Sequence, residues 1–234
     1  PYIITTPAEL QSMQDDLTAY YKLGNDIDLT SISWSPIGSS SVPFSGSLDG
    51  NGYSISNLQI TTPNSVYTGF FAVVSNSEIK NIQFIDSNIV ITNTYAANMH
   101  GTGIVSGAVS SDDTVIFSNI EIKNANIDVT ITASNTYIQN TIGGLYGHAG
   151  YNLAKTGSIT IDNCIIDVDI TSKNTAGTYR YLNLGGVMSY NDISTTISNV
   201  VTYGSITPPS QTLRGSNSGG ICSDGRNLLT VRNS

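Results

Sequence analysis

Asn140-Thr-Ile-Gly-Gly-Leu-Tyr-Gly147 is the stretch that decides the fold, because its Gly-Gly-apolar-x-small pattern recurs along the chain. Gly185-Gly-Val-Met-Ser189 and Gly219-Gly-Ile-Cys-Ser223 repeat it in full, whereas Gly103-Ile-Val-Ser106 and Gly69-Phe-Phe-Ala72 lack the first glycine. The second glycines stand at 69, 103, 144, 186 and 220, so the intervals are 34, 41, 42 and 34 residues. Such spacing is the signature of a repeat architecture.

Two further markers accompany the glycine motif. One is a recurrent asparagine, found at Asn81, Asn119, Asn163, Asn199 and Asn233, with an earlier instance at Asn57. The other is a β-branched alternating run, found at Asn88–Thr92, Asp128–Thr132 and Asp167–Thr171. Three short strands per period, with almost no helical pattern between them, predict an all-β parallel β-solenoid (β-helix) with about three short strands per rung.

This architecture predicts where the repeated side chains lie. The apolar residue of each glycine motif should stack inward along the axis, as Phe70, Ile104, Leu145, Val187 and Ile221. The small residues two positions after this apolar residue, namely Ala72, Ser106, Gly147, Ser189 and Ser223, should fit a crowded corner. Asn81, Asn119, Asn163 and Asn199 should form an amide ladder at a turn, each side chain bonding its neighbour one rung away.

The N-terminal residues predict a cap. Thr6-Pro7-Ala8-Glu9 has the residues of a capping box with proline at the first helical position. Leu10, Met13 and Leu17 share one face of a helix over about residues 7–17, which should cover the open end of the stack. We therefore divide the chain into an N-terminal cap with the first rungs, residues 1–60, and the repeats of residues 61–234, truncated at the C-terminus.

Composition narrows the class of protein. The chain has 234 residues, of which 11% are charged, with a net charge of −8 and a pI near 4.4. This acidity argues against a nucleic-acid partner.

Cys164 and Cys222 fall on different strand types and are expected to be buried free thiols. There is no apolar run of transmembrane length, and the stop within a repeat suggests a piece of a longer protein.

A more specific resemblance lies near the N-terminus. The motif Phe44-x-Gly46-x-Leu48-Asp49-Gly50-Asn51-Gly52-x-x-Ile55, with Asn25–Leu29 before it and the glycine repeats after it, resembles the GLUG-repeat proteins. These are similar to right-handed β-helices of the filamentous-haemagglutinin type, and the repeats accompany immunoglobulin-A-type peptidases of bacterial surfaces. The resemblance implies a right-handed solenoid that is extracellular, at the cell surface or secreted, often within a long adhesin of bacterial, archaeal or viral origin.

No catalytic constellation and no cofactor-binding motif is present in the sequence. His100 and His148 lack a third metal ligand in the local sequence.

Aligning Ile131 with Ile170 predicts that Asp128 lies beside Asp167, and Thr130 beside Asp169, on adjacent rungs. Such carboxylates would form either a solvated face or a weak calcium site. A polysaccharide lyase or tailspike-type glycosidase, which β-helices can also carry, would need a basic residue in register.

Tyrosines recur in the loops that precede the glycine motif. Tyr137 and Tyr179 stand seven residues before the second glycine, and Tyr95 stands eight before it. On successive rungs they would form a row with Tyr181, Arg180 and Arg214 nearby. The row would either bind glycans or a protein receptor, or fold over the apolar loops.

We therefore expect a structural and adhesive stalk of a surface protein. Its expected partners are a host or cell-surface glycan or receptor and further repeats of the same polypeptide, without membrane insertion. The rival is the carbohydrate-active enzyme. A lesser alternative is an ice-binding solenoid, for which Thr92, Thr132 and Thr171 supply only one threonine per rung.

Overall fold

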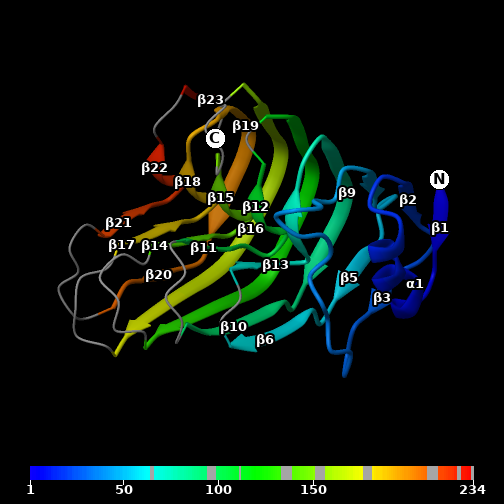
Figure 1. The fold of residues 1–234 in the computed structure, drawn as a ribbon, viewed down its shortest axis with the longest axis horizontal. Helices are drawn as coiled ribbons and strands as arrows, with labels where there is room; N and C mark the ends of the chain where they lie inside the picture. Colours follow the sequence, from blue (N-terminus) through cyan, green and yellow to red (C-terminus); the bar gives the residue numbers. More distant parts are fainter. Residues whose placement is uncertain are drawn as a thin grey trace.

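The computed structural model describes residues 1–63, 66–93, 99–110, 112–132, 139–150, 156–175, 181–209, 216–225 and 228–232. The protein is nearly all β, with one sheet of 13 strands and two sheets of five (Figure 1). Within these residues every strand pair is parallel. The predicted all-β fold with parallel pairing is therefore confirmed.

The 13-stranded sheet, called the large sheet below, runs the length of the molecule. Its main path is β1 (Tyr2–Ile4), β2 (Tyr20–Leu23), β4 (Ser47–Asp49), β9 (Ser77–Ile85), β13 (Thr114–Ile131), β16 (Ser158–Asn174), β19 (Ser194–Tyr203) and β23 (Leu229–Arg232). Beside this path lie β3 (Ile27–Asp28), β5 (Ser54–Ser56), β6 (Gln59–Pro63), β10 (Asn88–Asn93) and β20 (Ile206–Thr207).

The two five-stranded sheets contain the glycine motifs. The first small sheet is β7 (Tyr67–Thr68), β11 (Met99–Thr102), β14 (Gln139–Gly143), β17 (Tyr181–Gly185) and β21 (Ser216–Gly219). The second small sheet is β8 (Phe71–Val74), β12 (Ser106–Val109), β15 (Tyr146–Ala149), β18 (Met188–Asn191) and β22 (Cys222–Gly225). Each glycine motif forms the bend between the two sheets.

Equivalent strands of successive repeats pair with each other, so side chains of one kind stack in columns. One such column crosses the large sheet through Tyr2, Tyr21, Leu48, Ile79, Phe117, Ile161, Ile197 and Val231. Phe70, Ile104, Leu145 and Val187 are fully buried in one core, and Ile221 packs against it. The inward apolar ladder predicted from the glycine motif is confirmed.

Small residues are required where the two small sheets approach each other. A Cβ at Gly147 would overlap the backbone nitrogen of Thr102 and lie 2.6 Å from the carbonyl oxygen of Thr141. At the equivalent position, Ser189 is fully buried and its Oγ donates to the carbonyl of Asn183 over 2.6 Å. The prediction that small residues fit a crowded corner is confirmed here.

The N-terminal cap differs from the prediction in one respect. Thr6 makes the predicted capping box with Glu9, and Leu10 and Met13 are fully buried. However, α1 spans only Pro7–Gln11 and continues as a 3-10 helix over Ser12–Asp15, so a single helix over residues 7–17 is wrong. The helix ends where Asp16 instead accepts hydrogen bonds from the backbone and hydroxyl of Thr18.

Both cysteines are free thiols in the structure. Cys164 is buried, as predicted, whereas Cys222 is only half-buried. Burial raises the pKa of each thiol to about 11, so neither is a thiolate at neutral pH. None of the described helices has the length and apolar character to cross a membrane.

Candidate functional site

The predicted tyrosine row lies outside the described residues. This holds for Tyr95, Tyr137, Tyr179, Arg180 and Arg214. Of Tyr181, only the backbone is described, as the first residue of β17. The backbone register is informative nonetheless, because Met99, Gln139 and Tyr181 pair in sequence at the start of β11, β14 and β17. The three tyrosine loops therefore enter one sheet at neighbouring positions.

The carboxylate pair predicted on the alternating runs is wrong. Ile170 pairs with Ile127 rather than Ile131, so Asp128 lies opposite Thr171 and not beside Asp167. The error is a shift of four residues, which keeps every side chain on its predicted face because alternation has a period of two. The pattern alone therefore cannot distinguish the two registers.

The observed register gives these carboxylates separate surroundings. Asp169 lies opposite Asn126, and its Oδ1 accepts from the backbone N and the Oγ of Ser205 at 2.7 and 2.6 Å. Asp167 lies opposite Tyr203. Among the described residues no three His, Cys, Asp or Glu side chains are grouped to hold a metal ion. The weak calcium site predicted at Asp128, Asp167 and Asp169 has lost its geometric basis.

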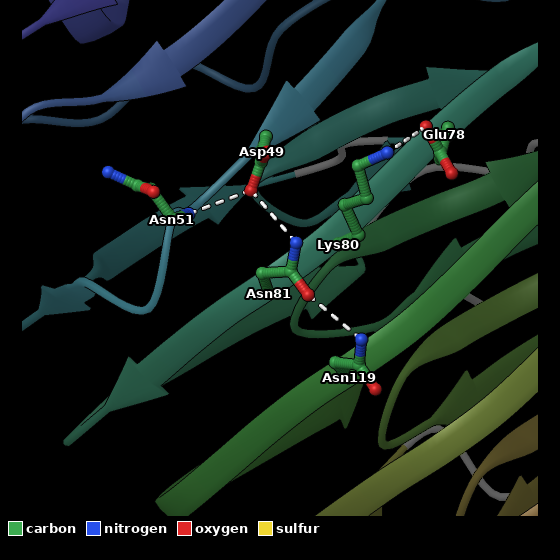
Figure 2. A network of polar contacts seen from close by, with 6 residues as sticks. All are labelled: Asp49, Asn51, Glu78, Lys80, Asn81 and Asn119. Carbon is green, nitrogen blue, oxygen red and sulfur yellow. Dashed lines mark hydrogen bonds and ion pairs between the residues drawn. The ribbon is translucent and has the colours of Figure 1, made fainter.

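The predicted amide ladder is present on the large sheet (Figure 2). Nδ2 of Asn119 donates to Oδ1 of Asn81 over 2.8 Å, and Nδ2 of Asn163 donates to Oδ1 of Asn119 over 2.7 Å. Asn81 in turn donates to Oδ1 of Asp49 over 3.0 Å. Asn199 departs from the prediction, because it donates to Asp162 rather than Asn163.

The backbone explains why asparagine occupies these positions. Asn81, Asn119, Asn163 and Asn199 have φ between 52° and 55°, in the left-handed region. Asparagine tolerates this conformation better than other residues with a Cβ, apart from aspartate. It therefore bends the strand and at the same time offers a donor and an acceptor to the neighbouring repeats.

A second ladder, made of two separate bonds and not foreseen from the sequence, lies at another bend of the same sheet. Asn57, which the sequence grouped with Asn81, belongs to this bend instead, because its neighbour Ser56 pairs with Ile85. Asn57 donates to Oδ1 of Asp28 over 2.8 Å, and Asn124 donates to Oδ1 of Asp86 over 2.6 Å. Asn57, Asp86 and Asn124 also have left-handed φ. In both ladders the side-chain amide donates toward the preceding repeat, and an aspartate accepts at the N-terminal end. The recurrence of Asn57, Asp86 and Asn124 was the signal available in the sequence.

The hydrogen bonds of the ladders hold neighbouring repeats together and do not prepare an aspartate for proton transfer. The bond from Asn57 lowers the pKa of Asp28, and the bond from Ser198 lowers the pKa of Asp162. A general acid needs the opposite shift. Two ion pairs flank the ladder region, Lys80 with Glu78 at 2.6 Å and Lys123 with Glu121 at 3.0 Å. These pairs are solvent-accessible and contribute little.

The two histidines are buried in different sheets, His100 in β11 and His148 in β15. His148 stacks on Tyr190 with ring centroids 4.7 Å apart. Burial lowers the pKa of His148 to about 3, so its ring is neutral at physiological pH. Their burial identifies them as core side chains.

A surface that the sequence reasoning missed lies at the N-terminal end of the large sheet. Two adjoining hollows of about 540 and 400 Å³ share Tyr2 and Asp16. Tyr2 is 64% exposed and Tyr20 is 67% exposed. In the sequence, this surface was indicated only by two pairs of neighbouring residues, Tyr20-Tyr21 and Asp15-Asp16, close to the first strand.

Comparison with known proteins gives limited similarity. No family model matches the chain. A Gly-rich membrane protein of Evansella cellulosilytica is 27% identical over 132 residues, which cover 53% of this chain and 14% of that protein. Halomucin of Haloquadratum walsbyi is 28% identical over 173 residues, which cover 68% of this chain and 2% of halomucin. The chain thus spans a small part of either relative.

One solved structure was also found. It is a crystal structure assigned to an immunoglobulin A1 protease of Bacteroides ovatus, with 16% sequence identity and a TM-score of 0.39. The similarity covers 100% of this chain and 84% of that one.

Proposed function

We propose that the chain is a structural and adhesive module of a larger surface or secreted protein, built as a right-handed parallel β-solenoid of the GLUG-repeat type. The observation that carries the proposal is the unbroken parallel register from Tyr2 to Val231 across the large sheet. The names of the two relatives, a Gly-rich membrane protein and halomucin, support a surface location.

Such a module would act mechanically. Each repeat is held to the next by backbone hydrogen bonds in three sheets, and the ladders add side-chain bonds along the same direction. Repeat proteins of this kind are stabilised by contacts between nearest neighbours. A rod of this construction can hold a binding region away from a cell surface.

Force spectroscopy tests this role. With the chain pulled between residues 1 and 234, a stack of repeats should unwind one repeat at a time. Each repeat of 34–42 residues would then release about 120–150 Å of chain, at about 3.5 Å per residue. Release of the whole chain in one event of about 800 Å would contradict a stack of repeats that unwind separately.

The adhesive part of the proposal concerns the tyrosine loops. Because Met99, Gln139 and Tyr181 pair in sequence, the loops containing Tyr95, Tyr137 and Tyr179 lead into adjacent strands. Tyrosines repeated at this spacing suit the stacking faces of sugar rings. Weak contacts repeated along one edge would add up through multivalency.

A glycan array tests the adhesive part. The Tyr95/Tyr137/Tyr179→Ala triple variant should lose binding that the parent chain shows. Tyr203→Ala, which removes an exposed tyrosine from the large sheet, is the matched control and should retain it. Binding that persists in the triple variant would refute the tyrosine row as the site. Shortened products from a bound polysaccharide would instead favour the rival glycan-cleaving enzyme.

A further inference from the structure

Strand β6 has an open edge, which is set by the path of the first repeat. Among the described strands β6 pairs only with β10, and Figure 1 shows the two side by side. The first repeat follows the second as far as Leu29, whose N–H donates to the carbonyl of Ser56. It then turns, because the N–H of Ile32 donates back to Leu29. Trp34 next stacks on Phe70, so the chain crosses to the small sheets instead of running beside β6.

The hydrogen bonds to β10 show which backbone groups of β6 face the open edge. The carbonyl of Leu58 accepts from the N–H of Asn88 over 2.8 Å, and Gln59 is the residue that pairs with Asn88. In a parallel pair, every second residue directs its N–H and its C=O to the same neighbouring strand. The carbonyl of Leu58 points toward β10, and the N–H and C=O of Gln59 and Thr61 therefore point to the open edge.

The open edge is neutral and exposed. β6 contains no charged residue, and the side chains of Gln59 and Thr61 are exposed. Natural edge strands are usually protected from pairing by charged side chains, by proline or by a covering segment. In β6 the first such feature is Pro63, which has no N–H and ends the series of donors. An added strand would find two donors and two acceptors between Gln59 and Thr61.

A row of polar side chains reaches the same edge. Nδ2 of Asn88 donates to Oε1 of Gln59 over 3.2 Å, which is the arrangement seen in the ladders. The first ladder begins at Asp49, and the bond from Asn57 ends at Asp28, each an aspartate of the preceding repeat. Among the described residues, none accepts from Nε2 of Gln59. This side chain therefore presents a donor at the place where a preceding repeat would supply an aspartate.

The inner face of β6 adds little to recognition. Ile60 lies between Gln59 and Thr61 and is 1% exposed, so its side chain is already covered. Selectivity must then come from the backbone groups and from the outer row of polar side chains. β-Branched residues suit the other positions of an added strand.

We propose that the open edge of β6 binds an extended segment of another polypeptide, which runs parallel to β6 and places an aspartate beside Gln59. Strand addition of this kind supplies main-chain hydrogen bonds. The aspartate would accept from Gln59 as Asp49 accepts from Asn81. The β6 strand of a second copy contains no aspartate and does not complete the row. The proposal rests on β6 and not on the tyrosine loops, so either can fail without the other.

The test titrates a fluorescent peptide, Ser-Asp-Val-Thr-Ile-Thr, with the whole chain and follows anisotropy. In the proposed pairing the valine N–H donates to the carbonyl of Gln59, whereas the N–H of the next threonine points away from β6. N-methylation of the valine should weaken binding by about tenfold or more, and N-methylation of that threonine by less than about twofold. Equal effects of the two methyl groups, or no saturable binding of the unmodified peptide, would overturn the proposal.

Two variants of the chain test the two kinds of contact. Thr61→Pro removes an N–H that faces the open edge, a change that edge strands tolerate, and should weaken binding by about tenfold or more. Gln59→Glu replaces the amide donor by a carboxylate. The parent chain should prefer the aspartate peptide to one with lysine in its place by about 3-fold to 10-fold, and Gln59→Glu should reverse this preference. Gln83→Glu adds the same charge to the outer face of β9 and should change neither affinity by more than about twofold.

Circular dichroism verifies that each variant is folded. Unchanged affinity of Thr61→Pro for the aspartate peptide would contradict strand addition, and a Gln59→Glu variant that still prefers this peptide would contradict the aspartate beside Gln59. Sedimentation equilibrium of the parent chain without peptide tests the other occupant. Dimers that Thr61→Pro abolishes would show that a second copy fills the open edge, which would also overturn the proposal.

Discussion

Asparagine at a left-handed bend carries two functions in a single side chain. It allows the strand to turn without the steric penalty of other side chains, and it links three successive repeats through one amide. Asn119 shows both, since φ is 53° and the side chain bonds to Asn81 and Asn163. Substitutions can separate the two functions.

Asn119→Gly retains the left-handed backbone but removes both ladder bonds, so it should lower the free energy of unfolding by about 1–2 kcal/mol. Asn119→Ala removes the same bonds and also places a Cβ in the left-handed region, which costs about 1 kcal/mol more. Urea denaturation monitored by circular dichroism measures both. If Asn119→Gly is as stable as the parent chain, the ladder bonds contribute nothing to stability.

His148 should make stability depend on pH in the acid range. In the folded chain its pKa is about 3, whereas in the unfolded chain it is about 6.5. Between these values the unfolded state binds the proton and the folded state does not. Stability from the neutral ring is therefore complete above about pH 6.5 and is lost as pH falls toward 3, by up to about 1.4 kcal/mol per unit.

His148→Phe tests this, because phenylalanine can stack on Tyr190 but cannot titrate. We expect the free energy of unfolding to fall less steeply in the variant between about pH 6.5 and 4. The lowered pKa values of Asp28 and Asp162 affect both proteins alike. Parallel pH profiles for the two proteins would show that His148 is not the group responsible.

At the scale of the element, the bend between the two small sheets depends on glycine because the backbones of successive repeats nearly touch. A Cβ at Gly186 would overlap the carbonyl oxygen of Gly220 in the next repeat. Gly220 has the same place in its own repeat, yet among the described residues a Cβ there meets nothing within 4 Å. The same motif therefore has different tolerance at different places in the stack.

Gly186→Ala should lower the free energy of unfolding by about 3 kcal/mol or more, because backbone atoms cannot move aside as a flexible side chain can. Gly220→Ala should change it by less than about 1 kcal/mol. Thermal denaturation of the two variants gives the comparison directly. Equal losses would show that the glycines serve a conformational need common to every repeat rather than close approach.

The register of neighbouring strands could be predicted from the sequence where a distinctive residue recurs in each repeat, and it could not be predicted where no such residue recurs. The ladder of Asn81, Asn119 and Asn163 was predicted because asparagine recurs at one place in each repeat, so that a single alignment fits. Asp128 was paired with the wrong residue because a run of alternating residues fits every even shift equally well. Only the bends on either side of such a run fix its position, and these depend on the loop lengths.

The whole molecule has two unlike ends. At the first end α1 and the adjoining 3-10 helix bury Leu10 and Met13 against the core. At the other end β21, β22 and β23 each have a strand partner on one side only among the described strands, and Cys222 and Leu229 are half-buried.

This asymmetry predicts the order in which the 234-residue chain loses structure. Backbone amides of β21, β22 and β23 should exchange with deuterium at least about tenfold faster than those of β14 and β15, since terminal repeats open locally at low cost. Mass-spectrometric hydrogen exchange resolves these segments. Uniform protection from β8 to β23 would mean that the stack opens only as a whole.

The ladders also bear on how such a chain can evolve. Because each amide donates toward the preceding repeat, a repeat duplicated at the carboxyl side brings its own donor, as Asn199 does when it donates to Asp162. A repeat inserted ahead of Asp49 or Asp28 would instead meet a carboxylate that can only accept, and the new repeat would need to offer it a donor. Lineages of this chain should therefore differ in length mainly toward the carboxyl terminus, while the capped beginning keeps its aspartates.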